Sequence, residues 1–243
     1  MKTNVLMLMF ALGLLSVTAT WSQTQPTVIR VPLIGEIAPS FTAESTNGTI
    51  IFPDDYAGKW KVLFSHPADF TPVCSSEILE LASDYDAFKK LNTQLVVVST
   101  DNLERHINWK KSLELLNYNG EGQQQIKFPI VDDQSKVIAS AYGMIHQHTA
   151  SSKDVRGVFI IDPSNVIRAL FFYPVTTGRN MNEIMRTVEA LQVSDKQMVL
   201  TPANWEPGKD VMLTGGAVGA QTTNKDPNVS ELTWYMMYKK LDK

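Results

Sequence analysis

The chain is poor in cysteine, because Cys74 is the only one in 243 residues. A single thiol cannot form an intrachain disulfide, and the lack of a Cys-x-x-Cys pair excludes a thiol–disulfide oxidoreductase. The chain also lacks an excess of positive charge: its formal net charge is −3, so nothing favours nucleic acid as a partner. It contains no internal repeat and no charge run typical of a membrane-surface patch.

Long apolar runs are scarce, and the exception lies at the N-terminus. Lys2 is followed by an almost unbroken apolar segment from Val5 to Val17, and Val17–Ala19 is typical of a cleavage site. The segment is too short to span a membrane. It predicts a signal peptide over residues 1–19 and export to the periplasm; the alternatives are an uncleaved signal anchor and a cytoplasmic protein. In an oxidising compartment, an odd cysteine indicates a free reactive thiol.

The surroundings of Cys74 are those of a reactive thiol. The apolar run Val62–Phe64 ends in a Pro-rich turn, in which Thr71 and Pro72 are typical of an N-cap and a first helical position. Cys74 then occupies the third helical position. The free N–H groups and the positive end of the helix dipole favour an anion there, so the sequence predicts a thiolate.

The alternative is that Cys74 is a small buried hydrophobe, as single cysteines commonly are. Two observations favour reactivity. The apolar stripe of the following helix begins only at Ile78, and the Pro-Thr-Pro turn has no packing purpose of its own. We therefore assign Cys74 a chemical role.

Strand-like runs alternate with helical periodicity along the chain. Strands are predicted at 62–64, 95–99, 128–131, 157–161 and 166–172, and helices at 74–91, 103–116, 136–142 and 182–191. This alternation implies an α/β sheet with parallel strands, whereas Asp162–Asn165 predicts a hairpin between the last two strands. A β-α-β-α opening that closes with a hairpin and a last helix is the thioredoxin-like plan.

The periodicity fades from Ser194 onward, where Pro, Gly and Asn become frequent. We therefore divide the chain into a thioredoxin-like domain over residues 28–193 and a C-terminal extension over residues 194–243. The extension is expected to pack against the main domain or a neighbouring subunit. Its last stretch, residues 232–241, is predicted to form a short helix with an aromatic face.

The segment Ser65–Cys74 resembles the peroxidatic motif of the peroxiredoxins, whose core is Pro-x-x-x-Thr-x-x-Cys, and in particular the single-cysteine, peroxiredoxin-6-like branch. Three further segments match in family order. They are Val155–Pro163 on the strand of the active-site arginine, Tyr173–Asn180 after it, and Thr201–Trp205 at the start of the C-terminal extension. The resemblance runs from about Val31 to about Met212.

The resemblance implies a thiol-dependent peroxidase that reduces hydrogen peroxide and organic hydroperoxides in antioxidant defence. The Cys74 thiolate attacks one peroxide oxygen and becomes a sulfenic acid, while the other oxygen leaves as water or alcohol. Donors aimed at these oxygens stabilise the transition state. Thr71 and Arg156 are implied to supply them and to bind the substrate, and Pro67 to shield the site from water. His66 is placed at the pocket mouth as a further substrate-binding residue, and Glu77 and Arg179 are supporting residues.

Each of these partners has a structural alternative. Thr71 could serve only as an N-cap, and Arg156 could be a solvated charge at a strand end. His66 could be an ordinary loop histidine, and a direct proton-transfer role is the less favoured reading. Glu77, one turn after Cys74, could orient Arg156 or interact only with the helix dipole.

Other chemistry-bearing residues carry weaker signals. His146 and His148 have a spacing that would suit a metal on a strand, but no further ligands follow in pattern, so we predict no metal and no cofactor. His106 and Trp109 share one predicted helix and are assigned to core packing.

Two departures from the family pattern narrow the function. Thr201 stands where two-cysteine peroxiredoxins have the resolving cysteine, so the usual disulfide cannot form. Some animal relatives also hydrolyse phospholipids with a serine in a Gly-x-Ser-x-Gly pentad, but the corresponding stretch here, Ala57–Lys61, has no serine. That second activity is therefore not expected.

The predicted partners follow from this chemistry: a peroxide substrate, and an external thiol reductant, either a thioredoxin-like protein or a small thiol. The resemblance also implies a homodimer or a ring of dimers. Two rival functions differ in class. A cysteine hydrolase with His66 as base would need a third group orienting the histidine, which the sequence does not reveal. A non-enzymatic thioredoxin-fold binding or chaperone module would leave the thiol without a role.

Overall fold

A five-stranded mixed sheet forms the centre of the main domain, in the order β5-β4-β3-β6-β7. The computed structural model describes residues 30–146, 153–214 and 227–241; the predicted signal peptide lies outside them. The sheet consists of β3 (Trp60–Ser65), β4 (Thr93–Ser99), β5 (Ile130–Asp132), β6 (Arg156–Ile161) and β7 (Ile167–Tyr173). β3, β4 and β5 run parallel, whereas β6 is antiparallel to β3 and β7. All five predicted strands and the closing hairpin are confirmed.

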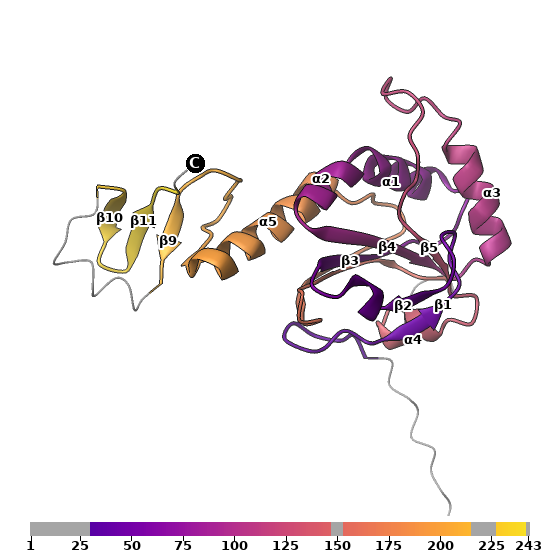
Figure 1. Cartoon of the computed structure of the whole chain (residues 1–243), viewed down its shortest axis with the longest axis horizontal. Coiled ribbons are helices and arrows are strands. Elements are labelled where there is room, and N and C mark those ends of the chain that lie inside the picture. Colours follow the sequence, from indigo (N-terminus) through magenta and orange to yellow (C-terminus); the bar gives the residue numbers. More distant parts are fainter. Residues whose placement is uncertain (1–29, 147–152, 215–226, 242–243) are drawn as a thin grey trace, which may run out of the picture.

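Two layers of secondary structure cover the sheet (Figure 1). One face carries α1 (Pro72–Ser83), α2 (Tyr85–Lys90) and α5 (Met181–Gln197), and α3 (Leu103–Leu113) contributes to the same core cluster. The other face carries α4 (Val137–Ala141) and a small β1–β2 hairpin, with β1 at Phe41–Ala43 and β2 at Ile50–Phe52, followed by the short helix η1 (Asp54–Tyr56).

The central strands are buried on both faces. Along β3, Val62 and Phe64 contribute to the core beneath α1, whereas Leu63 contributes to the opposite core. Successive side chains of a strand point to opposite faces, and helices on both sides of the sheet leave neither face to solvent. The end of β3 and the start of α1 are thereby fixed against two cores.

The helices differ from the predicted ranges at their ends. The helix predicted over 74–91 is two helices, because the chain breaks at Asp84 between α1 and α2. The last helix of the domain, α5, is longer than the predicted 182–191. It ends at Gln197 and so continues past residue 194, at which we expected the C-terminal extension to begin. Its start is fixed by Asn180, whose side chain accepts a hydrogen bond from the Glu183 N–H.

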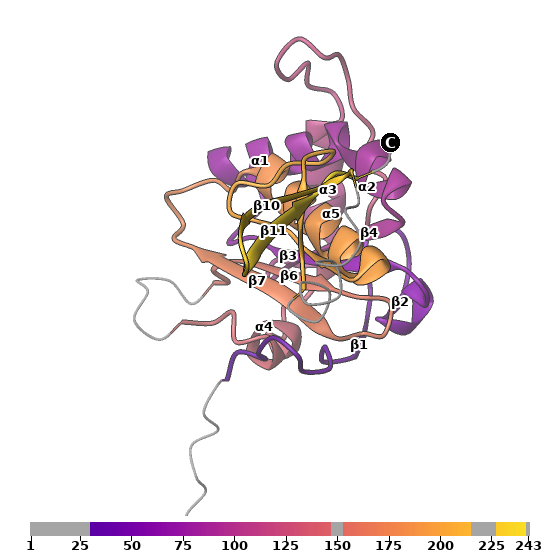
Figure 2. The same ribbon diagram turned by 90° about the vertical axis from the view of Figure 1, so that its left-hand side faces the viewer.

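The C-terminal extension forms a second, four-stranded sheet at the far end of α5 (Figures 1 and 2). Its strands are β8 (Val199–Leu200), β9 (Val211–Leu213), β10 (Val229–Thr233) and β11 (Met236–Lys239). The helix predicted over 232–241 is therefore wrong. β11 pairs with β10 and also with the distant β9, so non-local hydrogen bonds outweigh the local helical signal.

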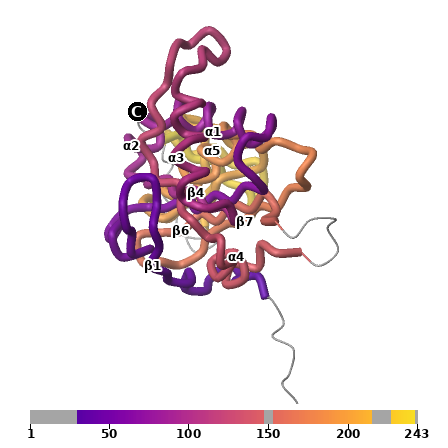
Figure 3. Tube along the Cα trace, turned by 90° about the vertical axis from the view of Figure 1, so that its right-hand side faces the viewer, coloured from indigo at the N-terminus to yellow at the C-terminus, as the bar shows by residue number. Residues whose placement is uncertain are grey.

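The remaining segments are loops. The connection between α3 and β5 projects from the domain (Figure 3) and contains the polar stretch Asn117–Gln125. Within the described residues, no helix has the length and apolar character needed to cross a membrane.

Candidate active site

The loop between β3 and α1 delivers Cys74 to the first turn of α1. Thr71 is the N-cap residue in an extended conformation, Pro72 is the first helical residue, and Cys74 is the third. The Thr71 hydroxyl, however, is not used as a cap: it donates to the Ala68 carbonyl oxygen at 2.8 Å. The first-turn N–H groups beside Cys74 are thus not bound by the Thr71 side chain.

Cys74 is fully buried and faces Arg156, the first residue of β6. The Nη1 of Arg156 lies 3.3 Å from the Cys74 sulfur and donates to Glu77 Oε2 at 2.7 Å. Its Nε and Nη2 donate to the Val175 carbonyl oxygen at 3.2 and 2.8 Å. Arg156 is therefore not a solvated charge at a strand end.

Glu77 lies one turn after Cys74 and is shared by two arginines. Besides Arg156, its carboxylate binds Arg179, which donates from Nε to Oε1 at 2.8 Å and from Nη2 to Oε2 at 2.7 Å. The Arg179 backbone N–H adds a bond of 2.9 Å to Oε1. Of the two roles considered for Glu77, the geometry supports the orientation of Arg156 rather than an interaction with the helix dipole alone.

Arg179 is buried and connects the site to the sheet. Its Nη1 donates to the carbonyl oxygens of Ser65 and Gly157, and its guanidinium carbon lies 3.4 Å from the centre of the Phe64 ring. Burial lowers the pKa of Arg179, and the hydrogen bond and charge of Glu77 oppose that shift.

The arginines and glutamate of this cluster carry one positive charge in excess. Arg156 and Arg179 carry two positive charges, while Glu77 supplies one negative charge, and all three side chains are buried. Uncompensated charge is costly in the interior. A thiolate at Cys74 would complete a neutral cluster of four charged groups.

A second polar cluster lies on the same loop and is fully buried. His66 Nε2 lies 2.8 Å from Asp69 Oδ1, and His106 Nδ1 on α3 lies 2.7 Å from Asp69 Oδ2. The His66 ring packs on Trp109, with ring centres 4.9 Å apart, and Trp109 donates from its indole to the Ser75 hydroxyl. His66 is therefore not an exposed residue at the pocket mouth, and His106 is bonded to the loop rather than only packed in the core.

Asp69 and His106 are the residues that sequence reasoning missed. The His66-x-x-Asp69 spacing within the motif was a usable signal, because a carboxylate three residues from a histidine in one turn can bind its ring. The third group that the hydrolase alternative required therefore exists. No sequence pattern could reveal the contact between His106 and Asp69, because the two residues are 37 positions apart and only the folded chain brings α3 against the loop.

The other predicted candidates are Pro67 and the pair His146 and His148. Pro67 is part-buried on the loop beside His66. Of the histidine pair, His146 stacks against Phe172, while His148 lies outside the described residues. Among the described residues, no group of three or more His, Cys, Asp or Glu side chains could hold a metal ion.

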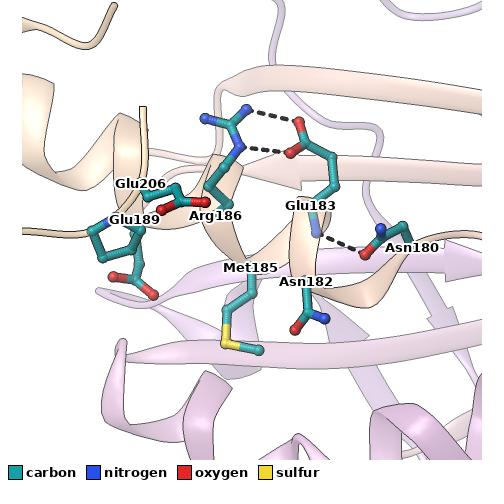
Figure 4. Close-up of a pocket in the computed structure, with 8 residues that line it drawn as sticks. Asn180, Asn182, Glu183, Met185, Arg186, Glu189 and Glu206 are labelled. Atoms are coloured by element: carbon teal, nitrogen blue, oxygen red, sulfur yellow. Dashed lines mark hydrogen bonds and ion pairs between the residues drawn. The ribbon is translucent and has the colours of Figure 1, made fainter. Parts of the chain in front are cut away.

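A groove of about 470 Å³ lies elsewhere, along α5 (Figure 4). In it Arg186 forms a paired contact with Glu183, and Asn180 caps the helix. Its charged side chains are Glu183, Glu189, Glu206 and Arg186, so carboxylates outnumber the one guanidinium. None of the groove's lining residues belongs to the Cys74 cluster, although Asn180 directly follows Arg179 in the chain.

Two family models match the chain. The AhpC/TSA family matches residues 34–170, and the C-terminal domain of 1-Cys peroxiredoxin matches residues 190–217. A peroxiredoxin of Methanosarcina mazei is 46% identical over 215 residues, covering 86% of this chain and 98% of that protein. The chain belongs to the peroxiredoxin family. It is thus a thiol-dependent peroxidase, as its sequence motif implies, and nothing supports the binding-module alternative.

Solved structures agree with this membership. A yeast mitochondrial 1-Cys peroxiredoxin, studied for thiol resolution via glutathione/thioredoxin systems, has a TM-score of 0.78 and 36% identity over 87% of this chain and 100% of its own. A cysteine-to-serine variant of peroxiredoxin 6 of Arenicola marina has a TM-score of 0.79 and 32% identity, covering 87% and 99% of the two chains. The thioredoxin-like fold with a C-terminal extension is thereby confirmed.

Proposed function

We propose that this peroxiredoxin works as a one-cysteine peroxidase in which Cys74 is the nucleophile and Arg156 its main partner. The observation that carries the proposal is the contact of 3.3 Å between Arg156 Nη1 and the Cys74 sulfur, in a cluster that a thiolate makes neutral. Negative charge moves along the S–O–O line as the peroxide bond breaks. The guanidinium and the first N–H groups of α1 stabilise that charge.

Three further residues have proposed roles around this step. Thr71 binds the peroxide once its hydroxyl turns from the Ala68 carbonyl oxygen to the substrate, a change of one side-chain torsion. Pro67 shields the sulfur from water. Glu77 holds Arg156 and Arg179 in place, because its two oxygens receive donors from both arginines.

An external thiol completes the cycle. After attack on peroxide, Cys74 is a sulfenic acid, and no second cysteine exists in the chain to condense with it. A thiol must attack the sulfenic sulfur, release water and form a mixed disulfide, which a second thiol then reduces. We propose a thioredoxin-like protein or a small thiol such as glutathione as the reductant.

Burial of Cys74 adds a constraint on this second half-reaction. Cys74 has no surface accessible to water, so hydrogen peroxide needs a small opening to reach the sulfur, and a protein thiol needs a larger one. The loop before α1 or the first turn of α1 must therefore open before a protein reductant can form the mixed disulfide. A small thiol has less need of that opening.

A peroxide pulse on the purified protein tests the scheme. One equivalent of peroxide should remove one thiol per chain, give no intrachain disulfide, and produce a mixed disulfide when reductant is added. Excess peroxide without thiol should drive Cys74 to sulfinic acid, seen as a mass increase of two oxygens. Sustained peroxide turnover without any added thiol would contradict the scheme.

We also propose that the protein is a homodimer or a ring of dimers, with the extension contributing contacts. The β10–β11 hairpin supports this, because its tip exposes Leu232, Trp234 and Tyr235. Light scattering should report a mass of at least two chains. Trp234→Ser should weaken the assembly, and a monomer at all concentrations in the unaltered protein would refute it.

Export remains a proposal that rests on the N-terminal pattern of residues 1–19. The mature chain should begin near Thr20 and be found in the periplasm or outside the cell. Mass spectrometry of the natural N-terminus is the direct test, and an intact Met1 on cytosolic protein would overturn it.

A further inference from the structure

Asp69 is the most heavily bonded residue of the loop between β3 and α1. Its side chain binds His66 and His106, and its backbone is held at both ends. The Asp69 N–H donates to Asp101 Oδ2 at 2.7 Å, and Arg105 donates from Nη2 to the Asp69 carbonyl oxygen at 3.0 Å. Every polar atom of this fully buried residue therefore has a partner. The partners lie on the loop between β3 and α1, on α3, or just before α3.

The two histidines must both donate to Asp69. Burial alone would raise the pKa of Asp69, but the hydrogen bonds from His106 and His66 outweigh it and bring that pKa down to about 2. An ionised carboxylate only accepts hydrogen bonds, so each ring nitrogen in contact with it carries the proton. Burial also lowers the pKa of His66, which keeps its ring neutral at neutral pH.

This arrangement fixes the orientation of both rings. His66 donates from Nε2 and His106 from Nδ1, which leaves His66 Nδ1 and His106 Nε2 as the ring nitrogens turned away from Asp69. Within the described residues, both of these nitrogens are buried without a hydrogen bond partner. A fixed ring orientation with one free acceptor is typical of a group placed for chemistry rather than for packing.

The same contacts strain the next residue. Phe70 has a φ of +57°, a conformation that bulky residues rarely adopt, and its ring lies half exposed beneath the Arg105 guanidinium. Such strain persists only where the neighbours impose it. Directly after Phe70 come Thr71, in its extended conformation, and the first turn of α1 with Cys74.

We propose that Asp69, held by His106 of α3, is a positioning residue of the peroxidase reaction. It sets the path of the loop that carries Thr71 into α1, and it holds His66 as a neutral ring with one free acceptor nitrogen. The proposal rests on the roles of Cys74 and Thr71 given above. It adds a dependence of the peroxide step on α3, an element that does not carry the thiol.

The decisive experiment compares His106→Leu with His106→Asn. Leucine fills a similar volume but removes the donor to Asp69, whereas asparagine keeps a nitrogen donor near the position of Nδ1. Two rates are measured for each variant at fixed pH: sulfenic acid formation by hydrogen peroxide, and alkylation of Cys74 by iodoacetamide. Asp69→Asn provides a second variant that breaks the network from the other side.

Misplacement of groups around the sulfur should slow the peroxide step by about tenfold to a hundredfold in His106→Leu and Asp69→Asn. Alkylation should be maintained, because Arg156 and the start of α1 are unchanged, and Asp69→Asn removes a negative charge and so cannot disfavour the thiolate. His106→Asn should recover most of the lost peroxide rate.

A merely structural role would lower the peroxide and alkylation rates together, or would lower only the melting temperature, and either result would overturn the proposal. Peroxide rates equal to the unaltered protein in both variants would overturn it too. Should Asp69→Asn fail to fold, the His106 pair decides alone. Failure of the underlying peroxidase assignment is separate, since it would show as no peroxide reaction in the unaltered chain.

Discussion

Arg156 Nη1 touches both the Cys74 sulfur, at 3.3 Å, and Glu77, at 2.7 Å. One nitrogen of the guanidinium thus connects the thiol to the carboxylate that holds the arginine in place. The contact between Arg156 and the sulfur should govern both the amount of thiolate and the rate at which the thiolate attacks peroxide. Substitutions can separate these two effects.

Arg156→Ala should slow sulfenic acid formation and raise the pH at which Cys74 becomes alkylated. Loss of one donor to a developing charge costs on the order of 3 kcal/mol, which is about a hundredfold in rate. Thr71→Val should slow the peroxide step without moving the alkylation profile, since the Thr71 hydroxyl donates to the Ala68 carbonyl oxygen rather than to the sulfur. Stopped-flow rates and pH-dependent alkylation measure both. If Arg156→Ala changes neither, the role assigned to the arginine is wrong.

Cys74→Ser should abolish peroxide reduction and leave the fold intact, because serine keeps the approximate size but is not a nucleophile at neutral pH. Steady-state peroxide consumption with an added thiol is the measurement, and circular dichroism checks the fold. Appreciable activity in this variant would mean that another group does the chemistry.

Glu77→Gln should act on Cys74 in the opposite direction to Arg156→Ala. Removing the carboxylate leaves Arg156 and Arg179 buried with less compensation, so the thiolate becomes more favourable and alkylation extends to lower pH. Breaking a buried ion pair from one side destabilises a protein by about 3–5 kcal/mol. Thermal melts and alkylation profiles of the variant should therefore show a less stable protein with a more ionised thiol. If the pH midpoint of Cys74 alkylation is unchanged or higher, the charges of Glu77, Arg156 and Arg179 do not control the thiol.

Acid should destabilise the protein through His66. Burial lowers the pKa of His66 below its ordinary 6.5, so the unfolded chain binds a proton there that the folded chain resists. The contribution of His66 to stability is therefore complete above pH 6.5 and is lost as the pH drops below that value. His66→Gln keeps a nitrogen near the position of Nε2 but does not titrate. Its melting temperature should depend less on pH between 7 and 5 than that of the unaltered protein, and an identical dependence would exclude His66 as the cause.

Asp154 should have the opposite effect, so that its contribution to stability falls as the pH rises. Both of its oxygens are buried without a hydrogen bond partner within the described residues, and burial, reinforced by the charge of Asp133, raises its pKa to about 8. The folded chain keeps a proton that the unfolded chain releases near pH 3.8, so stability falls as the pH rises from there to about 8. Asp154→Asn should therefore gain stability relative to the unaltered chain between pH 5 and pH 9. Melting curves across this range test it, and a constant difference would show that Asp154 does not titrate.

Local sequence by itself determined the strands, the start of α1 and the position of Cys74, because strand alternation, an N-cap and a proline at the first helical position act within a few residues. The family resemblance likewise identified Arg156, whereas Glu77 was proposed from its position one turn after Cys74. These features depend on short-range backbone preferences that each residue carries wherever it stands.

Tertiary structure alone decided which of these groups meet. The contacts of Glu77 with Arg156 and Arg179 join residues 79 and 102 positions apart, and the bond between Asp69 and His106 spans 37 positions. The hairpin over Val229–Thr233 and Met236–Lys239 was misread as a helix for the same reason, because its pairing with β9 is non-local. Packing of the sheet and helices fixes such pairs, and no local pattern in the chain carries that information.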